Sequence, residues 1–202
     1  MKTLIFSLFF ATGIAQQARA QEVGRDVAGQ YFSTGSRAPA TVSDEDHFLA
    51  IQLGQFMESS AWEWGQHERA EKTGNYSIGF TYRIQKYTDK MDLNLRVVAD
   101  EYNVVNEKPF KLSFMPLITF PEAASKFPLY FGGGLGAGVF FRQVKDESFL
   151  SLDYQLIMGA RFFDIYENAG FFIETGLKNH LLVTSSGQFN GVFLSAGAVF
   201  TF

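Results

Sequence analysis

The chain of 202 residues contains no cysteine. Disulfide bonds, thiolate nucleophiles and cysteine-ligated metals are therefore excluded, although an exported chain would meet an oxidising compartment. Basic residues are also scarce: 17 Lys and Arg are outnumbered by 21 Asp and Glu, which gives a formal charge of −4. Because an acidic surface repels the phosphate backbone, we expect no nucleic-acid partner.

Long apolar runs are missing after the first 20 residues, and none reaches the roughly 18 residues that a membrane-spanning helix needs. If the chain crosses a membrane, it must do so as strands. The N-terminus is different: Met1–Thr3 is basic, an apolar segment follows, and Ala18–Ala20 reads Ala-Arg-Ala. This order predicts a cleaved export signal over residues 1–20. Its removal would take away Lys2 and Arg19, so the formal charge would change from −4 to −6.

Residues 21–46 are polar and without a clear period, so we expect an arm that is irregular or forms a short helix. From residue 47 onward, apolar residues recur at every second position, which is the period of a β-strand. Most of the alternating segments span about ten residues, enough to cross a bilayer when tilted, whereas strands of soluble sandwiches usually span about five or six. The segments lie at residues 47–58, 76–85, 91–100, 110–114, 129–141, 150–161, 171–180 and 187–202. They predict one β-domain over residues 47–202.

The last segment, Gly187–Phe202, has one wholly apolar face and ends in Phe-Thr-Phe. Together with an export signal, this ending resembles the closing strand of bacterial outer-membrane β-barrels, where it also serves as an assembly signal. The resemblance implies an all-β fold, an eight-stranded antiparallel up-and-down transmembrane β-barrel of the small OmpA/OmpX/OmpW-like class. It further implies a Gram-negative outer-membrane location and a monomer. The implied partners are outer-membrane lipids, lipopolysaccharide and the barrel-assembly machinery, the last through the C-terminal strand.

The connections between the segments predict an orientation, because such barrels have short periplasmic turns and longer external loops. We expect periplasmic turns at residues 85–90, 120–127 and 163–169. We expect external loops at residues 59–73, 102–109, 143–148 and 182–188. The segment Ser59–Thr73 is predicted to be the longest of these loops.

Charged residues occupy the polar face of the segments, which in a membrane barrel meets the lumen. The predicted lumen network consists of Arg83, Asp92, Arg96, Asp153, Arg161, Glu174 and Lys178, with Asp100 and Lys111 beside them. Because side chains just fill an eight-stranded barrel, the network is either a set of ion pairs that fills the lumen or a path for ions or protons. If the turn after residue 85 is centred between Tyr87 and Thr88, Arg83 stands directly opposite Asp92, where opposite charges stabilise a sheet.

Four glycines on the inward face of one segment remove side-chain volume from one wall of the lumen. They are Gly132, Gly134, Gly136 and Gly138. This space either accommodates large neighbours such as Arg96 or Tyr130, or forms the wall of a cavity for a lipid chain or a small apolar ligand. The spacing does not match a dinucleotide-binding fingerprint, because no helix follows it.

Aromatic residues near the ends of the segments are predicted to form the girdles with which membrane barrels meet the lipid headgroups. They are Trp62, Trp64, Tyr76, Tyr82, Tyr87, Tyr102, Tyr130 and Tyr154. We expect them to anchor the barrel rather than to bind a ligand.

The three histidines, His47, His67 and His180, lack the spacing of metal ligands, so we expect neither a metal ion nor a cofactor. Some small outer-membrane barrels are lipid A deacylases, which place a His-x-Ser pair near a strand end and a glutamate further on. Here Leu181 and Leu182 follow His180, and no acid comes after them, so the resemblance extends to the barrel without the site. We therefore expect a non-enzymatic barrel with a structural or surface-interaction role. The alternatives are a narrow channel or hydrophobic-solute carrier, and a lipid A-modifying acyl hydrolase.

Overall fold

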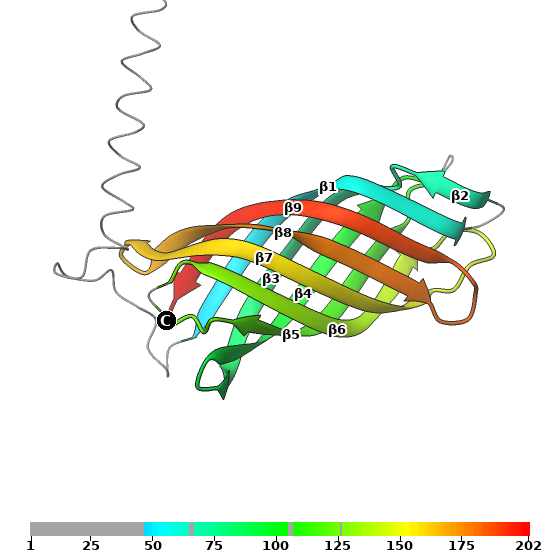
Figure 1. Ribbon diagram of the computed structural model, residues 1–202. Coiled ribbons are helices and arrows are strands. Elements are labelled where there is room, and N and C mark those ends of the chain that lie inside the picture. Colours follow the sequence, from blue (N-terminus) through cyan, green and yellow to red (C-terminus); the bar gives the residue numbers. More distant parts are fainter. Residues whose placement is uncertain (1–46, 65–66, 105–106, 126) are drawn as a thin grey trace, which may run out of the picture. The chain divides into compact units, whose positions relative to one another are not determined.

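The computed structural model describes residues 47–64, 67–104, 107–125 and 127–202. The expected export signal and arm, residues 1–46, lie outside the described residues. Within those ranges the chain forms nine antiparallel strands (Figure 1), and no helix is long and apolar enough to cross a membrane. The strands are β1 (Phe48–Trp64), β2 (His67–Glu71), β3 (Gly74–Thr88), β4 (Met91–Tyr102), β5 (Phe110–Phe120), β6 (Leu129–Arg142), β7 (Leu150–Tyr166), β8 (Ala169–Leu182) and β9 (Gln188–Thr201).

In the described part of the chain, eight of the nine strands close into a barrel. Strand β1 pairs with β3, each strand from β3 to β8 pairs with the next, and β9 pairs back onto β1. The closing pair runs from Phe48 opposite Thr201 to Trp62 opposite Gln188 (Figure 1). Since closure leaves no unpaired edge along these strands, every strand can satisfy its backbone hydrogen bonds within the ring. The prediction of an eight-stranded antiparallel up-and-down barrel is confirmed.

The connections fall into two groups at opposite ends of the barrel. We call the end with Phe48 and Thr201 the terminal end; it also holds the turns at residues 89–90, 121–128 and 167–168. We call the opposite end the loop end; it holds β2 and the connections at residues 103–109, 143–149 and 183–187. This grouping is the one that the sequence predicts.

The segment Ser59–Thr73 is a hairpin and not a loop, so the prediction is wrong here. Strand β1 continues to Trp64, and β2 pairs antiparallel with its end. The alternation stops in the sequence because a bulge lies between Phe56 and Glu58. A bulge adds one residue to a strand and moves the inward face by one position. Beyond it Ser59 and Ala61 face the lumen, and Glu63, with a φ of 50°, changes the phase again so that Trp64 is also buried.

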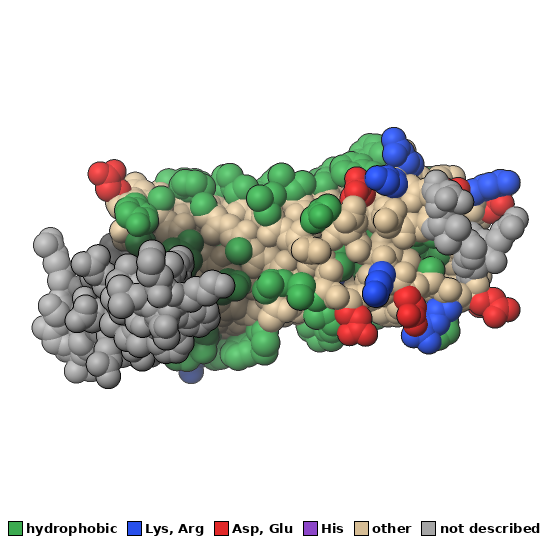
Figure 2. Space-filling view, turned by 90° about the horizontal axis from the view of Figure 1, so that it is seen from above, with side chains coloured by type: hydrophobic (Ala, Val, Ile, Leu, Met, Phe, Trp, Pro, Cys, Tyr) green, Lys and Arg blue, Asp and Glu red, His purple; other side chains and the backbone are tan. Residues whose placement is uncertain are grey.

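The two faces of each strand differ in polarity. On β3, Ile78 and Phe80 are 54% and 41% exposed on the outside, whereas Thr81 and Arg83 are buried inside. Figure 2 shows hydrophobic side chains spread along the barrel wall and charged side chains gathered toward the loop end. The barrel is therefore inverted relative to a soluble protein: its wall is apolar and its interior holds buried charges.

Three of the predicted girdle residues lie inside the barrel. Trp64, Tyr102 and Tyr130 are 1%, 0% and 4% exposed, so their assignment to the girdles is wrong. Tyr102 has the same parity on β4 as the inward Asp100, and strand alternation therefore places it in the lumen. Of the other predicted girdle residues, four are exposed by 38–61% on the outer wall: Trp62, Tyr76, Tyr87 and Tyr154.

Candidate functional site

The centre of the lumen is held by an ion pair that joins two opposite walls. Arg96 of β4 donates from Nη1 and Nη2 to the two carboxylate oxygens of Glu174 of β8, at 2.7 and 2.8 Å. The same guanidinium donates from Nε to Thr81 Oγ1 at 2.9 Å, and the Tyr130 hydroxyl donates to Glu174 Oε2 at 2.7 Å. A two-point contact with further hydrogen bonds at both partners is what allows a charge pair to remain buried.

Two lysine pairs lie nearer the loop end. Lys178 Nζ donates to Asp100 Oδ1 at 2.8 Å, again between β8 and β4. Lys111 Nζ donates to both oxygens of Asp153 at 2.8 Å, and Ser151 Oγ donates to Asp153 Oδ1 at 2.7 Å. Both pairs are buried, with side chains at most 5% exposed. The pairs link β4 to β8 and β5 to β7 and hold the walls at fixed distances.

A fourth pair joins Arg83 and Asp92 at the terminal end, with 2.8 Å between Nε and Oδ1. The sequence predicts that these two residues stand directly opposite, and that register is wrong. Arg83 is opposite Asn94 and Asp92 is opposite Lys86, because irregularities follow Arg83 and Lys86 in the β3–β4 pairing. The guanidinium reaches its partner along a diagonal of the sheet, which is within reach of a long side chain.

Arg161 is held by aromatic rings and a backbone oxygen. Its guanidinium carbon lies 4.2 Å from the centre of the Tyr130 ring and within 6 Å of the rings of Phe48 and Phe163. Its Nη2 donates to the backbone oxygen of Pro121 at 3.3 Å. A cation over an aromatic face gains about 0.5–2 kcal/mol, the larger value when both are desolvated. Arg161 therefore belongs to the packed interior although its partners differ in kind from those of Arg96.

An aromatic cap, which we define as Phe56, Trp64, Tyr102, Phe140 and Phe189, closes the lumen at the loop end. The Tyr102 ring lies 5.1–6.1 Å from the rings of the other four. His180 packs beneath the cap: its ring stacks on Phe189 at 4.6 Å, and its Nε2 lies 2.8 Å from the Tyr102 hydroxyl. The cap thus joins the ion-pair network through His180 and through Lys111 and Lys178, whose Nζ atoms lie 5.6 and 5.3 Å from the ring centres of Phe140 and Phe56.

An apolar cap closes the terminal end, and it consists of Phe48, Ala50, Ala123, Phe163, Phe172 and Val199. The rings of Phe48 and Phe163 lie 5.4 Å apart. Ala123 belongs to the turn between β5 and β6, and its backbone N–H donates to Asp92 Oδ2 at 2.5 Å. This turn is therefore folded over the end of the lumen and fastened to the Arg83–Asp92 pair.

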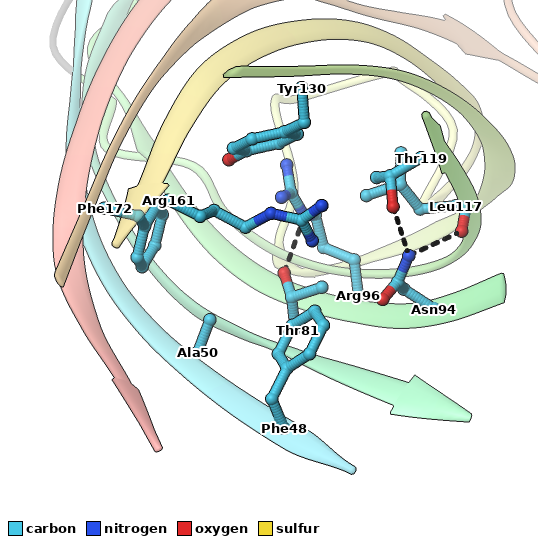
Figure 3. Close-up of a pocket in the computed structure, with 10 residues that line it drawn as sticks. All are labelled: Phe48, Ala50, Thr81, Asn94, Arg96, Leu117, Thr119, Tyr130, Arg161 and Phe172. Atoms are coloured by element: carbon cyan, nitrogen blue, oxygen red, sulfur yellow. Dashed lines mark hydrogen bonds between the residues drawn. The ribbon is translucent and has the colours of Figure 1, made fainter. Parts of the chain in front are cut away.

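The space left between the central pair and the apolar cap is small. Figure 3 shows Arg96, Thr81, Arg161 and Tyr130 converging on a cavity of about 10 Å³. That is the volume needed for about one water molecule. A second cavity, beside Asp153 and the middle of the barrel, is of the same size, about 10 Å³.

The inward glycines of β6 make room for neighbouring atoms. A Cβ added to Gly134 would lie 2.7 Å from Met115 Sδ, and one added to Gly138 would lie 2.7 Å from Asp153 Oδ2. At Gly132 and Gly136 an added Cβ would meet backbone carbonyl oxygens of β5, at 2.8 and 2.1 Å. The space is thus taken by β5 and by the Lys111–Asp153 pair, rather than by Arg96 or Tyr130 as the sequence suggests.

All seven residues of the predicted network lie buried in the one lumen. Sequence reasoning missed the part played by Tyr102, His180 and Tyr130. His180 in particular has an acid neighbour: its Nδ1 lies 3.7 Å from Asp153 Oδ1, a residue that precedes it in the sequence. In the described ranges, no group of three or more His, Cys, Asp or Glu residues is arranged to hold a metal ion.

No protein-family model matches this chain, and no curated protein matches it in sequence. Solved structures match it in fold. Ail, the attachment invasion locus protein of Yersinia pestis, has a TM-score of 0.51 at 13% identity, with 78% of this chain and 100% of Ail covered. The outer membrane enzyme PagL has a TM-score of 0.51 at 15% identity, with 75% of this chain and 97% of PagL covered. The chain has the fold of the small outer-membrane β-barrels.

This likeness confirms the resemblance that the sequence predicts, at the level of the fold. In a small outer-membrane barrel of eight strands, the interior is filled by side chains or holds at most a small ligand. The lumen of this barrel is of the filled kind: four ion pairs stand between two caps. The lumen braces the wall chemically, since eight of its charged groups are partnered in the four ion pairs and Arg161 is held by aromatic rings and a backbone oxygen.

Proposed function

We propose that this chain is a non-enzymatic barrel of the bacterial outer membrane with a structural or surface-interaction role. The observation that carries the proposal is the filled lumen, in which the aromatic cap, four ion pairs and the apolar cap follow one another. A barrel with such an interior can act only through its outer wall and its loops. Its partners are outer-membrane lipids and lipopolysaccharide on the wall and the barrel-assembly machinery at β9, and it works as a monomer.

The loop end supports a surface role because its connections are tied to one another. The backbone N–H of Lys145 donates to Glu107 Oε2 at 3.3 Å, which links the β4–β5 and β6–β7 connections. The backbone N–H of Ser148 donates to Ser185 Oγ at 3.2 Å, which links the β6–β7 and β8–β9 connections. Loops that hold each other in place present a preorganised surface, and preorganisation lowers the entropic cost of binding a partner.

The surroundings of His180 favour the non-enzymatic reading over an acyl hydrolase. A serine nucleophile needs a histidine base within hydrogen-bond reach. The Nε2 of His180 lies instead against the Tyr102 hydroxyl, and the whole ring is buried under the aromatic cap. A substrate would have to displace Phe189 and Tyr102 to reach this histidine.

Conductance measurements test the closed lumen against the channel alternative. We expect the purified barrel, reconstituted in a planar bilayer, to give no current steps above those of bare lipid, since the caps and ion pairs occupy the lumen. Protease resistance of the barrel in liposomes of the same lipid serves as the control for insertion. Discrete openings from inserted protein would overturn the closed-lumen proposal in favour of a narrow channel.

The membrane location is tested by a charge on the outer wall. Phe80→Arg places a guanidinium near the middle of β3, where contact with the hydrocarbon core should cost about 2–4 kcal/mol. The matched control is Tyr87→Arg, at the terminal end of the same strand and 56% exposed, where the cost should fall to about 1 kcal/mol or less. Urea unfolding in liposomes measures both free energies. Equal costs would show that the wall of β3 does not face lipid.

A further inference from the structure

A groove of about 400 Å³ runs over the outer wall near the loop end, where β1, β2, β8 and β9 lie side by side. Its polar lining includes Glu58, Ser60, Arg69, Lys72, Asn179 and Asn190. The volume lies within the range of about 300–1,000 Å³ that is usual for small-molecule sites. The filled lumen does not account for this groove, because these side chains lie on the opposite face of the strands.

The register of the strands places the groove where the wall changes from apolar to polar. Asn179, Asn190, Ser60 and Glu71 are paired in this order from β8 to β2, so they form one polar row across four strands. The next row toward the middle of the barrel is Leu177, Val192 and Glu58. It is followed by Thr175, Leu194 and Gln55 and then by Ile173, Ala196 and Leu53. The groove is therefore polar along its first row, and its second row sets Leu177 and Val192 beside Glu58.

The wall at the same level of β5 and β6 differs from the wall at the groove. Near the loop end of β5 and β6 the outward residues are Phe110 and Phe141, which are 40% and 70% exposed. On β8 and β9 the corresponding parts of the strands carry Asn179 and Asn190. On β8 and β9 these polar side chains line a hollow.

Both signs of charge border the polar row. Arg69 is exposed, lies 4.9 Å above the Trp62 ring and is 3.2 Å from Glu71. Lys72, the residue after β2, is exposed at the same border. Arginine and lysine donate to phosphate oxygens, while amides, hydroxyls and carboxylates exchange hydrogen bonds with the hydroxyl groups of a sugar.

We propose that this groove binds the phosphorylated sugar headgroup of a membrane glycolipid, with Arg69 and Lys72 at a phosphate, Asn179, Asn190 and Ser60 at sugar hydroxyls, and the acyl chains along Leu177 and Val192. The inference rests on the proposed outer-membrane location with the loop end outside, which places the groove in the outer leaflet. A lipid fits this order of rows better than a soluble ligand does, because its acyl chains can extend along the outer wall into the bilayer core. A protein bound at the polar row would leave Leu177 and Val192 in contact with lipid.

Native mass spectrometry of the detergent-solubilised barrel tests this assignment with diphosphorylated lipid A as the probe. The full chain should retain one lipid A molecule, and the variant Arg69→Gln/Lys72→Gln should bind it about a hundredfold more weakly, since the loss of each of the two charged hydrogen bonds weakens binding about tenfold. The matched control is Lys108→Gln/Lys145→Gln, which removes two exposed cations of the loop end that do not line the groove. It should bind lipid A as the unmodified chain does.

Two further arms define the ligand. Dephosphorylated lipid A should bind the unmodified chain about as weakly as diphosphorylated lipid A binds the Arg69→Gln/Lys72→Gln variant, and Asn190→Leu should weaken both lipids. Phosphatidylglycerol at the same concentration should not be retained, because it lacks the sugar. Equal retention of phosphatidylglycerol, or equal losses in the groove and control variants, would overturn the assignment.

The test separates this inference from the proposed function. A chain that inserts into liposomes as a protease-resistant barrel but retains no lipid A would refute the groove assignment and leave the barrel proposal intact. A chain that does not insert would refute both.

Discussion

Replacing Glu174 by glutamine should destabilise the barrel by about 3–5 kcal/mol, the cost of leaving one member of a buried ion pair without its partner. Arg96 is 3% exposed and Glu174 is 1% exposed, so bulk water does not reach the guanidinium that would lose its carboxylate. The Tyr130 hydroxyl, which donates to Glu174 Oε2, would lose its charged acceptor as well. Urea unfolding in liposomes measures the change in free energy.

The double variant Arg96→Met/Glu174→Met should recover much of this loss, because it removes both charges and fills the space with apolar atoms. The control is the pair Lys86–Glu122 at the terminal end, with side chains 25% and 18% exposed. There Glu122→Gln should cost about 1 kcal/mol or less, as at other partly solvated pairs. Additive losses from Arg96→Met and Glu174→Met would contradict the proposal, since they would mean that the two side chains do not interact across the lumen.

Sequence periodicity predicts the faces of this barrel well because the period of a strand is two and one face must meet lipid. Arg96 and Glu174 are both assigned correctly to the lumen in this way. Their pairing is not predictable from the period, since the two residues are 78 positions apart and meet only once β9 has closed on β1. Lys178 and Asp100 are also 78 positions apart in the sequence, so the period of the strands does not predict their pairing either.

Local irregularities account for the wrong assignments. A single bulge between Phe56 and Glu58 changes the phase of β1, and the strand therefore reads as a loop from Ser59 onward. Strand β2 is rich in charge and has no apolar face because it extends β1 beyond the apolar wall, so no alternation marks it. The Arg83–Asp92 pair survives two irregularities in its hairpin only because the arginine side chain is long enough to reach diagonally.

Two features of the sequence assign Tyr102 to different places. As a tyrosine near a loop it fits a girdle, and as a residue in phase with Asp100 it fits the lumen. Burial decides for the lumen, where Tyr102 joins four other aromatic rings and His180. The residue type favours a position in the girdle, and the phase of the strand favours the lumen. The phase is the stronger argument because an inward position follows from backbone geometry. Trp64 follows the same argument only when two changes of phase are counted, the bulge after Phe56 and Glu63 with its φ of 50°.

Gly197→Val should prevent stable closure of the barrel and cost more than about 3 kcal/mol, the upper end of the usual cost of overpacking. Gly197 lies on β9 opposite Gln52 of β1, at the pair of strands that closes the ring. A Cβ at this position would lie 1.8 Å from the backbone oxygen of Ile51, and that oxygen belongs to the β1 backbone and cannot turn aside as a flexible side chain could.

The matched control for this variant is Ala196→Val, the preceding residue of the same strand, which is exposed on the outer wall. Both substitutions add a branched side chain to β9, and valine suits a strand in general. Only the inward position forces β1 and β9 apart, so Gly197→Val should leave the protein protease-sensitive in liposomes and Ala196→Val should leave it resistant. Equal resistance of the two variants would show that β9 can move away from β1 without loss of the barrel, and closure would then not be the step on which its stability depends.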